Sequence, residues 1–81
     1  MSKYPQVLIN VSVSGEVDLH RPAIQEAVRA VESQLGDHGR VLLRPSGTEP
    51  VVRVMVEGAD AGAVERHARE LAGVVRDTLS A

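Results

Sequence analysis

Two segments of this sequence repeat apolar residues at helical spacing, and neither can bury its apolar stripe without a partner layer. The first segment runs from about residue 21 to 35, and the second spans residues 61–79. The apolar positions are Ile24, Val28, Val31 and Leu35 in the first and Val64, Ala68, Leu71, Val75 and Leu79 in the second. We therefore expect two amphipathic helices packed on one common layer.

Residues at the ends of these segments are typical of helix termini. Pro22 suits the first turn, where its missing N–H is not needed. Gly36 can adopt the left-handed conformation that often ends a helix. Asp60 can accept hydrogen bonds from the first amides of the second helix. These residues predict where both helices begin and where the first one ends.

The remaining residues predict strands for the other layer. Residues 6–13 alternate, with Val7, Ile9, Val11 and Val13 on one face. Residues 40–43 and 51–57 are predicted to form a hairpin with an enlarged loop. The order strand, helix, strand, strand, helix predicts a small two-layer α+β domain with both helices on one face of the sheet.

Composition bounds the class of protein. A chain of 81 residues, 43% hydrophobic and 25% charged, predicts one globular domain over residues 1–81 rather than a disordered segment. The single aromatic residue, Tyr4, and a net charge of −2 argue against a nucleic-acid partner. With no cysteine, no membrane-spanning run and no signal segment, we expect a cytoplasmic domain with no membrane partner. An expression-vector origin of residues 1–3 stays open.

The segment from Arg44 to Pro50 concentrates hydrogen-bond donors in a short loop. It contains one guanidinium group, two hydroxyl groups and the backbone amides around Gly47. Glycine lets the backbone approach a ligand closely, and successive amides in such a turn can form an anion-binding concavity. Pro45 and Pro50 restrict the backbone at both ends of the loop.

Arg53 joins this loop if the hairpin has a suitable register. With Arg44 opposite Val51, Leu42 lies opposite Arg53, and the two arginines share one face of the sheet. Residues 40–53 contain three arginines and one glutamate, although the whole chain has a net charge of −2. A local positive patch of this kind favours a small anion over a polyanion.

A purely structural interpretation of the same residues stays open. The loop is then a stiff, solvent-exposed turn whose arginines pair with Glu49 and Glu57. Glu49 also counts against simple anion binding, because a carboxylate beside a phosphate repels it unless it faces an arginine or a sugar hydroxyl.

The loop together with its flanks resembles a known family. Arg-Pro-Ser-Gly-Thr-Glu-Pro at residues 44–50, followed by residues 51–57, resembles the phosphate-binding loop of the α-D-phosphohexomutase superfamily. The likeness is strongest to the bacterial phosphoglucosamine mutase branch. Residues 4–11 are similar to the start of the family's fourth, C-terminal domain, and residues 38–43 fit the approach to the loop. The resemblance covers the chain from Tyr4 onward.

The resemblance implies a fold and an activity. The family's C-terminal domain has a TATA-binding-protein-like fold with a largely antiparallel sheet. The parent enzymes interconvert glucosamine 6-phosphate and glucosamine 1-phosphate through a phosphoserine and a bisphosphorylated sugar. Their C-terminal loop holds the phosphate that is not being transferred. The matching positions here are Arg44, Pro45, Ser46, Gly47, Thr48 and Arg53. Glu49 would contact these residues rather than the phosphate.

The resemblance also implies what this chain lacks. The family's active-site serine loop, its magnesium loop and its sugar-reading motif are absent, so no catalytic residue is expected here. Mg²⁺ would be bound by another domain of the same polypeptide. The partners of this chain would be those other domains and the phosphosugar substrate. Alternatives are a phosphomannomutase or phosphoglucomutase domain, or a non-enzymatic interaction module. Gly47 favours the amino-sugar branch only weakly.

The histidines suggest no metal site. His20, His38 and His67 are far apart and do not show the spacing of a ligand set. We expect all three to be surface or structural residues, with His38 the nearest in sequence to the hairpin.

Overall fold

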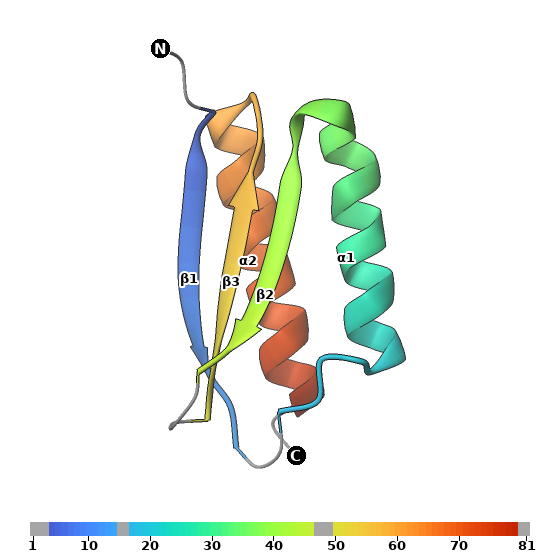
Figure 1. Ribbon diagram of the computed structural model, residues 1–81, viewed down its shortest axis with the longest axis vertical. Coiled ribbons are helices and arrows are strands. Elements are labelled where there is room, and N and C mark those ends of the chain that lie inside the picture. The colour runs from blue at the N-terminus through green and yellow to red at the C-terminus, as the bar shows by residue number, and fades with distance from the viewer. Residues whose placement is uncertain (1–3, 15–16, 47–49, 80–81) are drawn as a thin grey trace.

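The computed structural model describes residues 4–14, 17–46 and 50–79. Figure 1 shows three strands and two long helices, with a short 3₁₀ turn at Gly36–His38 after the first helix. The elements are β1 (Gln6–Ser12), α1 (Pro22–Leu35), β2 (Arg40–Pro45), β3 (Val51–Glu57) and α2 (Ala61–Leu79). None of the described helices is long and apolar enough to cross a membrane.

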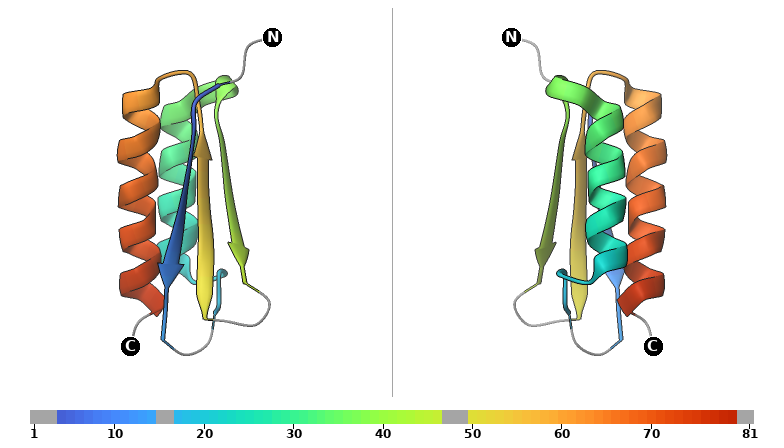
Figure 2. Two further views of the ribbon diagram at one scale, coloured as in Figure 1. Left: turned by 90° about the vertical axis from the view of Figure 1, so that its left-hand side faces the viewer. Right: turned by 90° about the vertical axis from the view of Figure 1, so that its right-hand side faces the viewer.

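The sheet is antiparallel throughout and its strands lie in the order β1-β3-β2. Both helices cover the same face of this sheet, as the two side views in Figure 2 show. The predicted two-layer α+β fold is therefore confirmed. Within the described residues no helix covers the opposite face of the sheet, which is called the open face below.

The helix termini follow the predicted residues. α1 begins at Pro22, and Gly36 ends it with a positive φ of 71° while its N–H donates to the carbonyl of Glu32. At α2, Oδ1 of Asp60 accepts hydrogen bonds from the amides of Gly62 at 3.0 Å and Ala63 at 3.4 Å. Both ends are thus satisfied locally, as the sequence predicted.

The core lies between the sheet and the helices. On β3, the side chains of Val52, Val54 and Val56 are fully buried beneath them. The predicted stripe of α2 is buried along its whole length, and Ile24 and Val31 anchor α1. The alternation of β1 is also confirmed, since Val11 and Val13 are buried while Leu8, Asn10 and Ser12 are exposed.

The hairpin register differs from the sequence prediction by two residues. Arg44 lies directly opposite Arg53, and Leu42 lies opposite Met55 rather than Arg53. The cause is continued pairing toward the loop, where the Ser46 N–H donates to the Val51 carbonyl at 2.7 Å. β2 therefore reaches Pro45, beyond the predicted end at residue 43. Because side chains alternate with period two, both arginines still share one face.

Candidate functional site

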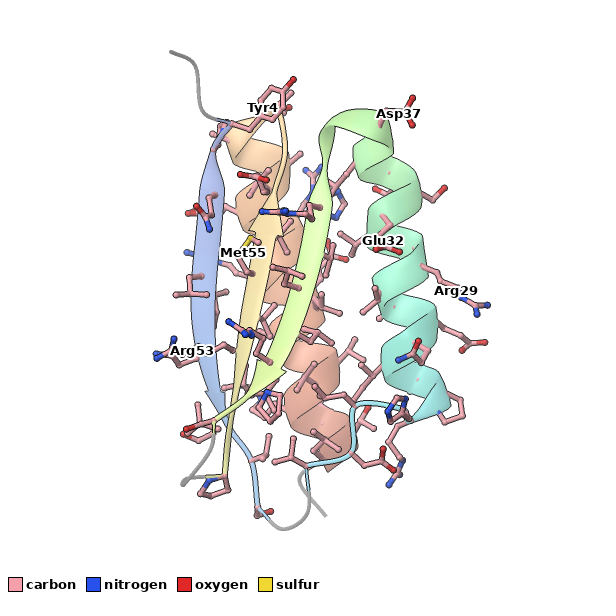
Figure 3. All side chains as sticks on the ribbon, in the orientation of Figure 1. Tyr4, Arg29, Glu32, Asp37, Arg53 and Met55 are labelled. Atoms are coloured by element: carbon pink, nitrogen blue, oxygen red, sulfur yellow. The ribbon has the colours of Figure 1, made fainter. Side chains whose placement is uncertain are left out.

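The open face presents three successive rows of side chains that cross the sheet. Each row has one residue from β1, one from β3 and one from β2. We call them the salt-bridge row (Gln6, Glu57, Arg40), the aliphatic row (Leu8, Met55, Leu42) and the arginine row (Asn10, Arg53, Arg44). Figure 3 views this face, with Met55 and Arg53 on β3 turned toward the reader.

The arginine row holds two exposed cations side by side. Arg44 and Arg53 occupy directly paired positions, so their Cβ atoms are roughly 5 Å apart. Among the described residues, neither has a carboxylate within 4 Å. Glu57 instead pairs with Arg40 at 3.7 Å, so the expectation that Glu57 neutralises Arg44 or Arg53 is wrong. Glu49 lies outside the described residues.

Like charges directly opposite each other in a sheet destabilise the pairing. An anion between Arg44 and Arg53 would reverse that repulsion. Guanidinium groups suit this role because their fork of donors fits two oxygens of a phosphate or carboxylate at once. A hollow of about 290 Å³ lies at this place and is lined by Arg44, Pro45, Ser46 and Arg53.

Backbone hydrogen bonds hold both ends of the adjoining loop. The Ser46 N–H donates to Val51, and the Val13 N–H donates to the Pro50 carbonyl at 2.8 Å. The Ser46 amide is therefore engaged, which leaves its hydroxyl group as the donor available to a ligand. The Ser46 amide is thus not among the loop amides that could face an anion, as the sequence analysis had allowed. Gly47, Thr48 and Glu49, also expected at the site, lie outside the described residues.

Sequence reasoning did not single out three residues of this face. Asn10 shares the arginine row, and Leu8 and Leu42 flank Met55 in the aliphatic row. One signal was available: a leucine at position 8 sits in the polar phase of an otherwise alternating strand. The second leucine could be recognised only with the correct hairpin register.

No metal centre is formed by the part of the chain that the structure describes. No three histidine, aspartate or glutamate side chains come together there as a ligand set. His67 is buried between α1 and α2 with 6% of its surface exposed, and His20 is exposed. The side chain of His38 lies outside the description. These residues do not fit a magnesium site.

The arginine pair beside the hairpin loop thus lies on the uncovered face of a small α+β sheet. The sequence matches the family described as "Phosphoglucomutase/phosphomannomutase, C-terminal domain" over residues 8–74. The chain belongs to this family, which confirms the resemblance drawn from its loop.

Two similar relatives are both phosphoglucosamine mutases. The chain is 64% identical over 76 residues to the phosphoglucosamine mutase of Halorhodospira halophila, covering 93% of this chain and 17% of that protein. It is 56% identical over 82 residues to that of Methylococcus capsulatus, covering 100% of this chain and 18% of the relative. The chain thus spans less than a fifth of the length of these enzymes.

Solved structures give the same fold. The chain matches the Aspergillus fumigatus N-acetylphosphoglucosamine mutase in complex with GlcNAc-6P and magnesium with a TM-score of 0.78 at 29% identity. That match covers 98% of this chain and 16% of the other. A point variant of that mutase, in complex with glucose 1,6-bisphosphate, matches with the same TM-score at 30% identity, covering 96% of this chain and 16% of that one.

Proposed function

We propose that this chain, as one domain over residues 1–81, holds a phosphate group of the substrate in a phosphosugar mutase. The reaction of the whole enzyme is the interconversion of glucosamine 6-phosphate and glucosamine 1-phosphate. The observation that supports this most is the arginine row, where Arg44 and Arg53 occupy directly paired positions and neither has a carboxylate of the described residues within 4 Å. The mutase names of the relatives support the substrate class.

Each proposed residue has a distinct role. Arg44 and Arg53 donate paired N–H groups to the phosphate oxygens, and the hydroxyl of Ser46 donates a further hydrogen bond. Pro45 stiffens the start of the loop. By the family resemblance, Gly47 and Thr48 add hydrogen-bond donors to the loop, and Glu49 contacts these residues rather than the phosphate.

The domain contributes to the reaction by binding rather than by chemistry. A phosphate held away from the reacting end fixes the orientation of the sugar, which lowers the entropic part of the barrier. The nucleophile, the acid–base groups and Mg²⁺ would belong to other domains of the same polypeptide, in the cytoplasm. This 81-residue chain by itself is then inactive.

A backbone-amide NMR titration of the chain with glucosamine 6-phosphate tests the site. We expect saturable shifts at Ser46, Gly47, Thr48 and Arg53, with a Kd near the millimolar range, because a few charge-assisted bonds are largely offset by ordering costs. Unphosphorylated glucosamine is the control and should shift none of them. Equal shifts with both sugars would contradict phosphate recognition, and mannose 6-phosphate and glucose 6-phosphate test the related mutases.

The role of Arg44 is tested in the full-length mutase that contains this domain. Arg44→Ala removes charge-assisted bonds worth about 1.5–3 kcal/mol each, so kcat/KM should fall roughly tenfold to a hundredfold. The exposed Arg29 on α1, at the helix layer, provides the matched control, and Arg29→Ala should leave kcat/KM unchanged. Unchanged kinetics in Arg44→Ala, with the fold intact by circular dichroism, would rule out the assigned role.

A further inference from the structure

The aliphatic row is exposed at both of its ends. Leu8 is 56% exposed and Leu42 is 44% exposed, whereas Met55 between them is 7% exposed. A hollow of about 240 Å³ extends from this row to Arg40 on one side and to Arg44 and Arg53 on the other. The row therefore joins the arginine row in one continuous depression.

Folding of this chain gives no reason for the two exposed leucines. Both helices pack on the other face of the sheet, where the core is already closed by Val52, Val54 and Val56. The aliphatic row has a polar row on each side, and an apolar centre inside a polar rim is the usual anatomy of an interface. In the salt-bridge row, Arg40 and Glu57 already pair with each other, so among the described residues the aliphatic row and the arginine row are the parts of the open face left without a partner.

The position of the arginine row indicates what covers the aliphatic row, and this step rests on the proposed function. A substrate bound to Arg44 and Arg53 lies on the open face, and its reacting groups must approach from in front of that face. Neighbouring rows are about 7 Å apart along a strand. A domain that reaches the substrate therefore also stands over Leu8 and Leu42.

The length of the matched relatives fits such a cover. The matched relatives are more than five times as long as this chain, since it covers 17% to 18% of them. The family is a C-terminal domain, so the additional residues precede it. They would join next to Tyr4, which Figure 3 places beside the salt-bridge end of the open face.

We propose that the aliphatic row is a docking surface for a preceding domain of the same polypeptide, which meets it with an uncharged apolar patch. Docking there holds that domain in front of the arginine row. It also removes water beside the bound phosphate, which strengthens the attraction between phosphate and arginine.

Thiol labelling at position 42 tests this docking, because the chain contains no cysteine of its own. Leu42→Cys is prepared in the 81-residue chain and in the full-length mutase, and the maleimide reaction is followed by mass spectrometry of the peptide that contains position 42. Without substrate, we expect labelling at least tenfold slower in the full-length protein. Ser33→Cys, at an exposed position of α1, is the matched control and should react equally in both.

Several outcomes would overturn the docking surface. One is an equal labelling rate at position 42 in both proteins, repeated with Leu8→Cys to exclude a local artefact. Another is protection in the 81-residue chain that grows with its concentration, which identifies a second copy as the occupant. A third is protection that appears only when glucosamine 6-phosphate is added, which identifies substrate as the trigger.

The same variants separate this proposal from the proposed function. If Leu42→Cys is protected in the full-length protein but the phosphate titration shows no shift at Arg53, the docking surface is supported and phosphate binding fails. If the titration succeeds and labelling is equal, phosphate binding is supported and the docking surface fails.

Discussion

At the residue scale, the turn from α1 to β2 needs glycine twice, for two different reasons. Gly36 has a φ of +71°, a backbone conformation that residues with a Cβ atom rarely adopt. Gly39 has an ordinary extended backbone, with a φ of −122°. A side chain at position 39 would instead collide with the side chain of Leu35. The close approach of helix and strand at this turn, rather than backbone strain, thus excludes a larger residue.

Gly39→Ala should lower the free energy of unfolding by about 1–3 kcal/mol, the usual cost of forcing extra atoms into a packed site. Gly73→Ala is the control, since a Cβ there meets no atom within 4 Å beyond its chain neighbours and the backbone of its own helix. It lies inside α2, where alanine is favoured over glycine by roughly 0.5–1 kcal/mol, so this variant should be more stable. Urea unfolding followed by circular dichroism measures both, and equal effects would contradict the packing argument.

At the scale of elements, the two faces of β3 have opposite roles. Val54 faces the helices and is fully buried, whereas Arg53 beside it is exposed on the open face. Stability should therefore come almost entirely from the helix side. The open face is free to carry residues chosen for binding.

Leu71→Ala and Leu42→Ala remove the same atoms from opposite sides of the molecule. Leu71 of α2 is 1% exposed, so its loss should cost about 2–5 kcal/mol through lost contacts and a cavity. Leu42 is 44% exposed, so its loss should cost less than about 1 kcal/mol in this chain. Thermal unfolding compares them, and a similar shift in Tm for both would show that the open face contributes to the core.

The sequence predicted the elements well and their exact pairing less well. The stripes of α1 and α2 and the alternation of β1 have a clear period, and burial on one side follows directly from it. The register of β2 against β3 has no such signal, because a shift of two residues leaves every side chain on the same face. The shared face of Arg44 and Arg53 was therefore predictable, whereas their direct opposition and the aliphatic row beside them were not.

At the scale of the whole molecule, charge is distributed unevenly. The chain has a net charge of −2, yet Arg44 and Arg53 lie together on the open face, beside the paired Arg40 and Glu57. A negative protein with a confined positive patch repels polyanions in general while attracting a compact anion at one place. The affinity for a phosphosugar should therefore depend on the charge of the phosphate itself.

Binding of glucosamine 6-phosphate should tighten severalfold between pH 5 and pH 7.5. The second ionisation of a phosphate ester has a pKa of about 6, so the ligand gains a negative charge, while arginine stays protonated throughout. Glucosamine 6-sulfate is the matched control, because it carries the same amine while the charge of its sulfate group stays constant over this range. NMR titrations of both ligands measure the difference, and an equal pH dependence would assign it to the protein instead.

The strand order has a consequence for how the chain folds. β1 pairs with β3, far away in sequence, and makes no pair with β2, so the contact of Leu8 with Met55 closes a loop of more than forty residues. The nearby β2–β3 pairing closes a much shorter loop and should form first.

Ile9→Val should then speed unfolding and leave the folding rate almost unchanged, as stopped-flow measurements can check. During synthesis, β1 leaves the ribosome first but has no partner until β3 follows, several seconds later at about 5–20 residues per second.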